Sequence, residues 1–169
     1  MIQKFVEDLT ERIDLVLIAE YFDESLIMLK RELCWDLDDV VYFRFHQRGQ
    51  DYKEKNITEK MNLQIIKWNK ADWDLYQHFN RTLWEKISKE GLHFQDEVKE
   101  LRRKIWTLEK QCISSMQVSE KTGELETILS SEIPAYNRYL CRKMTMSEKE
   151  YIAYLKEKLS SKLKRRGAV

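Results

Sequence analysis

Apolar positions between residues 15 and 45 change from a short continuous run to a helical spacing and back to a short run. Leu15–Ala19 is too short to span a bilayer and rich in branched residues, which favours a buried strand. Apolar residues then recur at helical spacing from Leu26 to Leu33, and Val40–Phe43 forms a second branched and aromatic run. This pattern predicts a strand–helix–strand unit over residues 15–45, the size of a βαβ unit.

Helical spacing dominates the rest of the chain. The sequence predicts a helical part over residues 56–112, a loop over 113–135 and C-terminal helices over 136–166, with a short amphipathic helix over residues 1–12 ahead of the first strand. Two capping boxes are predicted, Asn56–Glu59 and Thr145–Glu148. The segment before Pro134 is polar, contains Gly123 and shows no apolar period, so it is interpreted as the most mobile loop.

Aromatic residues follow one face of the predicted helix over 71–90. We interpret this face as core, together with the nearby Trp68; its members are Trp73, Tyr76, Phe79 and Trp84. His78 is interpreted as a packing histidine rather than a catalytic base. The Lys-rich tail, Lys156–Arg166, is interpreted as a solvated helix end, with contact to a membrane surface as the alternative.

Composition narrows the class of protein. The chain has 169 residues, 43% of them hydrophobic and 35% charged, which suits one folded domain rather than a disordered chain. A net charge of +1 gives no field that would attract nucleic acid. No run reaches the length of a transmembrane helix and no signal-peptide pattern is found, so these features alone favour a soluble, cytosolic protein.

Two features favour a secretory compartment instead. Asn56-Ile57-Thr58 and Asn80-Arg81-Thr82 are N-glycosylation sequons, although Asn56 could equally be a helix cap. Three cysteines allow at most one internal disulfide, and their spacing does not match a zinc site: Cys34, Cys112 and Cys141. Buried free thiols are the alternative to a disulfide.

Polar groups at the ends of the two predicted strands are the candidate ligand contacts. A basic loop follows the second strand and could clamp a phosphate or sulfate; a plain solvated loop is the alternative. Its residues are Arg44, His46, Gln47, Arg48, Lys53 and Lys55. Glu20 and Asp23 could orient a sugar hydroxyl or pair with this loop, and Asp23 could instead be a helix cap. No complete catalytic motif, such as GxxxxGK[ST] or GxSxG, is present.

Several blocks of the chain are similar to one enzyme family. The block EYFDESLIMLKRELCWDLDDVVYFRF resembles the central part of the galactose 3-O-sulfotransferases, the family that includes galactosylceramide sulfotransferase. The resemblance continues through WNKADWDLYQHFNRTLWEKI, LRRKIWTLEKQCI and YLCRKMTMSEKEYIAYL, and so covers nearly the whole chain in order.

The resemblance implies an α/β fold, here the C-terminal part of a single P-loop-like sulfotransferase domain over residues 1–169, mostly helical with the short strand–helix–strand unit. It implies a Golgi membrane enzyme with its catalytic part in the lumen. This enzyme would transfer a sulfuryl group from 3′-phosphoadenylyl sulfate (PAPS) to the 3-hydroxyl of galactose on a glycolipid or glycoprotein, without a metal ion. In that setting a Cys112–Cys141 disulfide becomes plausible, and only a missing N-terminal anchor would contact the membrane.

The same resemblance assigns roles to the candidate residues. In the related uronyl and heparan 2-O-sulfotransferases a basic loop closes over the adenosine bisphosphate, and by position Arg44, Gln47 and Arg48 match it. Glu20, Asp23 and His46 are then the candidates for acceptor binding. The catalytic residues are expected in the PAPS-binding half, whose P-loop-like segment is missing from this sequence, so we expect this chain alone to be inactive. A non-catalytic helical interaction module, or an inactive remnant of the enzyme, is the alternative.

Overall fold

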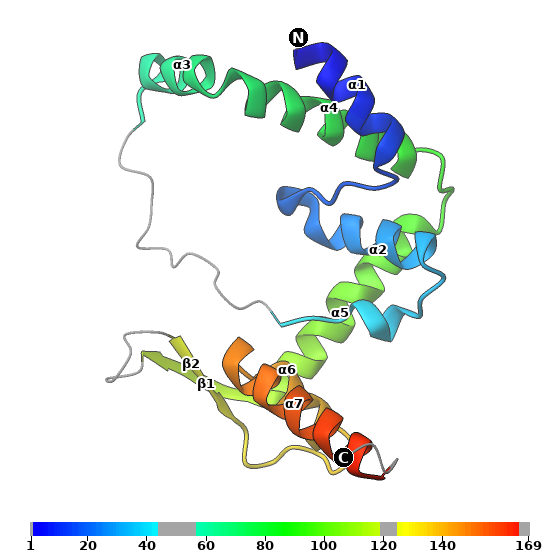
Figure 1. Ribbon diagram of the computed structural model, residues 1–169, viewed down its shortest axis with the longest axis vertical. Helices are drawn as coiled ribbons and strands as arrows, with labels where there is room; N and C mark the ends of the chain where they lie inside the picture. Colours follow the sequence, from blue (N-terminus) through cyan, green and yellow to red (C-terminus); the bar gives the residue numbers. More distant parts are fainter. Residues whose placement is uncertain (1, 44–56, 119–124, 166–169) are drawn as a thin grey trace. The chain divides into compact units, whose positions relative to one another are not determined.

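The computed structural model describes residues 2–43, 57–118 and 125–165 (Figure 1). The chain divides into two compact units. Unit 1 comprises Met1–Val41 and Gln47–Arg103, and unit 2 comprises Tyr42–His46 and Lys104–Val169. The long helix α5 (Phe94–Cys112) contributes its first half to unit 1 and its second half to unit 2.

Unit 1 is helical in its described part. Its elements are α1 (Ile2–Arg12), the 3-10 turn η1 (Ala19–Tyr21), α2 (Phe22–Glu32), the 3-10 turn η2 (Leu37–Val40), α3 (Glu59–Trp68), α4 (Lys70–Ile87) and the start of α5. The helices predicted over residues 1–12, 26–33, 56–68, 71–90 and 93–112 are therefore confirmed, with small shifts of their ends. Helix α1 lies against α4 (Figure 1).

The two strands predicted on either side of α2 are wrong. Residues 15–18 have no regular secondary structure, and Val40 ends η2. Ile18 is extended and buried, but its backbone N–H donates to Ser25 Oγ at 3.0 Å rather than to a neighbouring strand. A strand needs a partner along its length, and in the described part of the chain the only sheet lies elsewhere, in unit 2. Local hydrogen bonds therefore replace the predicted strand–helix–strand unit.

Helix starts differ from the predicted caps by two residues. Thr58, not Asn56, caps α3, because its Oγ1 accepts from the Met61 N–H at 3.3 Å. The capping box of α7 (Glu148–Arg165) uses Ser147 and Glu150 rather than Thr145 and Glu148: the Ser147 N–H donates to Glu150 Oε2 at 2.8 Å, and the Glu150 N–H donates back to Ser147 Oγ at 3.4 Å. In both cases the sequence offers two possible caps, and the helix begins at the second.

Buried apolar side chains of unit 1 come from all its main helices except α3. Leu26, Ile27 and Met28 of α2, Phe79, Leu83 and Ile87 of α4, and Phe94, Val98 and Leu101 of α5 are all below 9% exposed. Between α4 and α5 the chain passes through Gly91, whose φ of +82° is a left-handed conformation that glycine adopts without strain. These side chains form most of the buried apolar part of unit 1.

Ion pairs join α2 to the first half of α5. Glu97 accepts from Lys30 Nζ and from Arg31 Nε and Nη2, each at 3.1 Å, and Arg31 also pairs with Glu90. Burial raises the pKa of Glu97, but the hydrogen bonds from Lys30 and Arg31 outweigh this effect and leave its pKa below the ordinary value of 4.5. The charged form of Glu97 therefore stabilises unit 1.

The prediction of a loop over residues 113–135 is wrong for the two strands of unit 2. Residues 113–135 include strand β1 (Ile113–Val118) and strand β2 (Leu125–Leu129), which pair antiparallel with Met116 opposite Thr127. Polar residues alternate irregularly with apolar ones here, so no period is visible in either strand alone. Backbone hydrogen bonds between the two strands stabilise them, and the side-chain pattern of one strand alone does not reveal this pairing.

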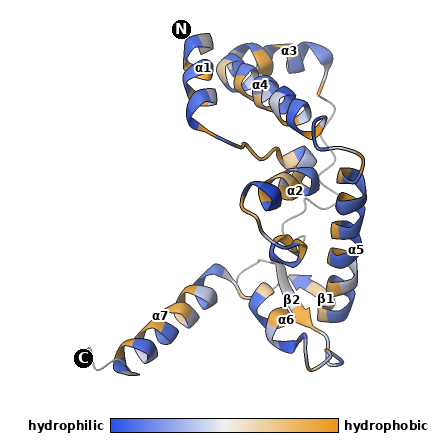
Figure 2. Ribbon diagram, turned by 90° about the vertical axis from the view of Figure 1, so that its right-hand side faces the viewer, coloured by the Kyte–Doolittle hydropathy of each residue, from blue (hydrophilic) through white to orange (hydrophobic). Residues whose placement is uncertain are grey.

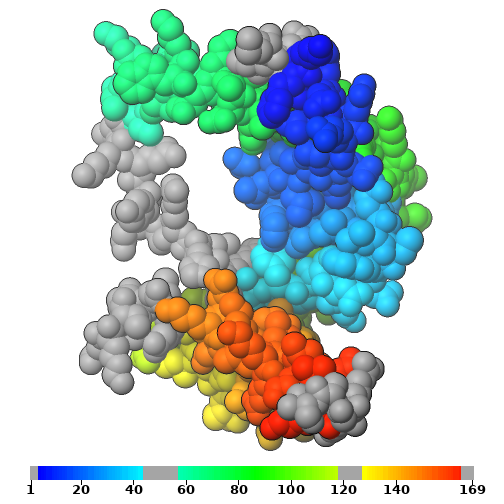
Figure 3. Space-filling model, viewed as in Figure 1, coloured from blue at the N-terminus to red at the C-terminus, as the bar shows by residue number. Residues whose placement is uncertain are grey.

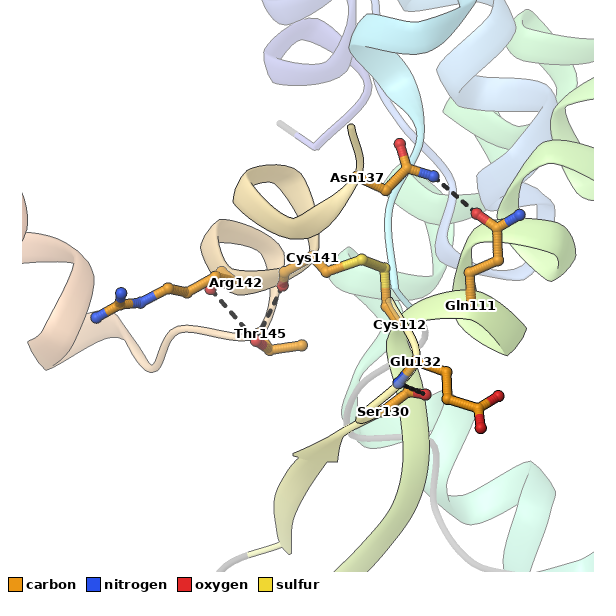
Figure 4. Close-up of a disulfide and its surroundings, with 8 residues drawn as sticks. All are labelled: Gln111, Cys112, Ser130, Glu132, Asn137, Cys141, Arg142 and Thr145. Atoms are coloured by element: carbon orange, nitrogen blue, oxygen red, sulfur yellow. Dashed lines mark hydrogen bonds between the residues drawn. A yellow bond between two sulfur atoms is a disulfide. The ribbon is translucent and has the colours of Figure 1, made fainter. Parts of the chain in front are cut away.

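A disulfide links the end of α5 to helix α6 (Arg138–Met144) in unit 2 (Figure 4). Cys112 and Cys141 are fully buried, with their Cα atoms 5.2 Å apart, and this is the pairing that the family resemblance implied. Phe43 and Ile133 complete the buried cluster around the bridge. Asn137 Nδ2 donates to Gln111 Oε1 at 2.7 Å beside it, so side-chain hydrogen bonding also joins α5 to the start of α6.

We expect the double variant Cys112→Ser, Cys141→Ser to destabilise unit 2 by about 3–4 kcal/mol, because the bridge closes a loop of 29 residues in the unfolded chain. Hydrogen exchange of the β1 and β2 amides would show the loss. The matched control is Cys34→Ser, since Cys34 is free and exposed. Equal protection in the double variant and the control would contradict the prediction.

Glu97→Gln should lower the stability of unit 1 by about 1 kcal/mol near neutral pH. Because the folded-state pKa of Glu97 is lowered, its contribution is present above pH 4.5 and is lost as the pH falls through the folded-state value. Urea unfolding at neutral and acidic pH would test this, with the difference between wild type and Glu97→Gln shrinking in acid. Glu85→Gln, which removes an exposed pair with Arg81, is the control and should change little at either pH.

Candidate functional site

All the predicted nucleotide contacts lie outside the described residues. Arg44, His46, Gln47 and Arg48 fall in residues 44–56, and so does the sequon asparagine Asn56. Their roles as cofactor contacts, acceptor contact and glycosylation site therefore stay predictions. The remaining candidates, Glu20, Asp23 and Asn80, all lie in unit 1.

Asp23 is engaged inside the protein. Its carboxylate is 7% exposed and accepts from Arg102 Nε at 2.7 Å, while Arg102 Nη2 donates to Glu24 at 2.9 Å. The hydrogen bond to Asp23 is the main reason that the pKa of Arg102 is raised. This geometry gives Asp23 a positioning role between α2 and α5, and its predicted contact with an acceptor hydroxyl stays a prediction.

Glu20 is exposed on η1 and faces α4. Burial raises the pKa of Tyr76 on α4, and the nearby charges of Glu20 and Tyr21 raise it further. Tyr76 therefore keeps its phenolic proton and can donate a hydrogen bond beside a carboxylate that accepts one. A donor and an acceptor at neighbouring points on a surface suit the paired hydroxyls of a sugar.

Aromatic rings on η1 and α4 form two contacting pairs. The rings of Tyr21 and Trp84 meet edge to face with centroids 4.9 Å apart, and those of Trp73 and Tyr76 lie 6.0 Å apart. Trp73 is 41% exposed and Trp84 37% exposed. We call Glu20, Tyr21, Trp73, Tyr76 and Trp84 the α4 aromatic surface.

The interpretation of these aromatic residues as core is thus right for Phe79 and wrong for the tryptophans. Phe79 is 7% exposed, whereas Trp68 is 89% exposed. Helix α4 buries its stripe of Phe79, Leu83 and Ile87, and a stripe about 100° wide leaves Trp73 and Trp84 at its margin. Helical periodicity alone could not separate the two stripes, because they overlap on the helix.

Asn80 lies on the same helical face as Trp73, Tyr76 and Trp84, at spacings of three and four residues. Its Oδ1 is buried and has no hydrogen-bond partner among the described residues. Leaving such an acceptor unpaired costs about 1–3 kcal/mol. A polar residue in the middle of an aromatic stripe was the signal in the sequence that could have marked this surface.

A separate pocket of about 200 Å³ lies between the end of α1, residues 13–16 and α4. Ile13, Leu15, Phe79 and Leu83 contribute apolar lining. Its cation, Lys86, already donates to the Asp14 carbonyl and lies 3.7 Å from Glu32. The α4 aromatic surface, which offers exposed rings with a donor and an acceptor, is therefore the better candidate site.

His78 supports the packing of α1 on α4 rather than a reaction. Its Nε2 is 2.8 Å from Thr10 Oγ1, and its ring meets Phe79 edge to face at 5.1 Å. No group of His, Cys, Asp and Glu side chains suited to hold a metal ion occurs in residues 2–43, 57–118 and 125–165.

Comparison with known proteins identifies the family. The family model described as galactose-3-O-sulfotransferase matches residues 1–159, which include parts of both units. The chain belongs to the galactose-3-O-sulfotransferase family. No solved structure is significantly similar to it.

Two curated relatives cover more than nine-tenths of the chain, and a third covers a shorter part of it. Mouse galactose-3-O-sulfotransferase 3 is 32% identical over 97% of this chain and 41% of its own length. Mouse galactosylceramide sulfotransferase is 32% identical over 91% of the chain and 40% of its own length. Bovine galactose-3-O-sulfotransferase 4 is 43% identical over 59% of the chain. The chain therefore spans about two-fifths of the length of the first two of these relatives.

Asn80→Leu should stabilise unit 1 by about 1 kcal/mol, because it replaces an unpaired buried acceptor with an apolar group of similar size. Urea unfolding of the full chain would measure this. Asn80→Asp, which buries a charge at the same position, is the matched variant and should destabilise unit 1. A loss of stability in Asn80→Leu would mean that Oδ1 has a partner in solution. A mass increase of the wild type expressed through the secretory pathway, if Asn80→Leu abolishes it, would mean a glycan at Asn80.

Proposed function

We propose that this chain is the C-terminal part of a carbohydrate sulfotransferase that uses PAPS to sulfate the 3-hydroxyl of galactose on a glycolipid or glycoprotein. The observation that carries this proposal is the family match over residues 1–159. The sequence contains no GxxxxGK[ST] segment, and the chain spans about two-fifths of the relatives' length. Residues outside this chain would therefore bind the 5′-phosphosulfate.

The reaction needs positioned cations more than covalent chemistry. The 3-hydroxyl oxygen of galactose attacks sulfur, an S–O bond forms, and the bond from sulfur to the phosphate oxygen breaks to release adenosine 3′,5′-bisphosphate. The hydroxyl proton passes to a base, and cations stabilise the charge on the leaving phosphate. On this proposal Arg44 and Arg48 hold the nucleotide with Gln47, and no metal ion is required.

The α4 aromatic surface is our proposed acceptor side. One face of a galactose ring is lined by C–H groups and stacks on an exposed aromatic ring, for which Trp73 and Trp84 are available. Glu20 can then accept from one sugar hydroxyl while Tyr76 donates to another. His46, in the basic loop, is kept as a further candidate contact to the acceptor.

The Golgi lumen is the proposed compartment. The buried Cys112–Cys141 disulfide suits an oxidising environment, and N-glycosylation sequons are used only in proteins that enter the secretory pathway. In the described part of the chain no helix is long and apolar enough to cross a membrane.

A chimera tests the proposal. The part of mouse galactose-3-O-sulfotransferase 3 that this chain matches, about two-fifths of that enzyme, would be replaced by the chain and assayed with PAPS and a β-galactoside. We expect activity in the chimera and none in the chain alone. In the chimera, Trp73→Ala or Glu20→Gln should raise KM for the galactoside about tenfold and leave KM for PAPS unchanged, whereas Arg48→Ala should do the reverse.

The matched control is Glu11→Gln, an exposed glutamate on α1 that should change neither constant. If the chimera does not accumulate, the same substitutions are made at the aligned positions of the mouse enzyme. Turnover by the purified chain alone would contradict the proposed division of the PAPS site. An unchanged galactoside KM in both acceptor variants would remove the α4 aromatic surface from the mechanism.

A further inference from the structure

Within unit 2, tyrosine side chains of α7 contact α6. The hydroxyls of Tyr139 on α6 and Tyr154 on α7 are 2.8 Å apart, and Lys143 Nζ lies 5.6 Å from the ring centroids of both Tyr139 and Tyr151. Tyr151 and Tyr154 lie close together on α7, with ring centroids 6.1 Å apart. These contacts direct the tyrosine side of α7 toward α6.

A different side of α7 carries a row of exposed aliphatic residues, which we call the α7 stripe. Ile152 is 43% exposed, Leu155 45%, Leu159 58% and Leu163 39%. The row appears as repeated orange bands along α7 in Figure 2, and the residues of α6 and α7 form a broad surface of unit 2 in Figure 3. The stripe is about 16 Å long at 1.5 Å per residue. Four large aliphatic side chains in one exposed line indicate a contact surface rather than scattered surface leucines.

Lysines flank the α7 stripe on both sides. At 100° per residue, Lys149 and Lys156 border one edge of the stripe, and Lys158 and Lys162 border the other. Lys158 Nζ lies 6.0 Å from the Tyr154 ring, so it follows the tyrosine side of the helix. Residues 156–164 contain four lysines and one glutamate, in a chain whose net charge is only +1.

The acidic residues of α7 lie away from the stripe beyond its first turn. Glu148 lies one turn before Ile152 on the same line, so the apolar surface begins at Ile152. Glu150 is engaged in the cap with Ser147, and Glu157 lies on the far side of the helix. The exposed apolar line is therefore bordered by positive charge along its length, which is complementary to an anionic surface.

The spacing of the α7 stripe favours a flat partner over another helix. Leu163 follows Ile152 by 11 residues, which is close to three turns, so the row stays straight along the helix. Ile152, Leu155 and Leu159 also fit the spacing of a coiled-coil seam, but the next seam position is Lys162 rather than an apolar residue. A second copy would bring the lysine borders of both helices together, whereas anionic headgroups neutralise lysines that extend from an inserted apolar face.

We propose that α7 lies in the plane of an anionic lipid bilayer, with the α7 stripe inserted at the level of the acyl chains and its lysines among the headgroups. The helix rests on the surface and does not span it. This contact is additional to any anchor elsewhere in the protein and does not depend on the proposed sulfotransferase activity.

Vesicle flotation of the full 169-residue chain tests the proposal. We expect binding to vesicles of phosphatidylcholine with phosphatidylserine, weaker binding to phosphatidylcholine alone, and a decrease with added salt. Leu159→Asn should weaken binding about tenfold, because it removes one inserted side chain. Lys156→Gln should weaken binding to the anionic vesicles about fivefold.

The matched control is Ser161→Asn, which introduces the same residue on the opposite side of the same helix. Leu159 and Ser161 are both exposed, and far-UV circular dichroism would verify that both variants keep their helices. Absence of binding to the anionic vesicles, or an equal loss in Leu159→Asn and Ser161→Asn, overturns the proposal. A concentration-dependent dimer that Leu159→Asn abolishes would assign the stripe to a second copy and overturn it as well.

Discussion

The arrangement of unit 1 depends on the ion pairs between α2 and the first half of α5. Arg31 reaches Glu97, and Arg102 reaches back to Asp23, so the two helices are joined at two levels. Single exposed ion pairs contribute little to stability, but these are partly buried and share partners, and removing one charge leaves the others unpaired. Because η1 precedes α2 directly, this network also sets the position of Glu20.

Unit 2 is stabilised by a disulfide. A covalent bridge between Cys112 and Cys141 joins α5 to α6 inside a small apolar cluster, and the β1–β2 hairpin extends directly from the end of α5. A core of this size buries little apolar surface, so the disulfide replaces packing that the unit lacks. Helix α7 then adds few contacts of its own and presents an aliphatic line to its surroundings.

Both candidate surfaces depart from the pattern of a self-contained globular core. On α4, exposed tryptophans and the unpaired carboxamide oxygen of Asn80 lie beside a buried apolar stripe. On α7, four aliphatic residues are exposed between lysines. Each of these two surfaces lowers the stability of the isolated chain, which is a usual consequence of keeping a surface for binding. The chemistry differs: rings with a donor and an acceptor suit a sugar, whereas an apolar line bordered by cations suits anionic lipid.

The sequence by itself determined the long helices, because a 3.6-residue apolar period is a local property, and its blocks determined the family. Tertiary structure decided the rest. The runs at Leu15–Ala19 and Val40–Phe43 have strand-like composition, but strands form only where a partner lies alongside, and none does in the described chain. Conversely, β1 and β2 are strands although their segment shows no apolar period, because each has the other as its partner. Likewise, only packing shows which aromatic residues of α4 are buried, since two overlapping stripes share one helical face.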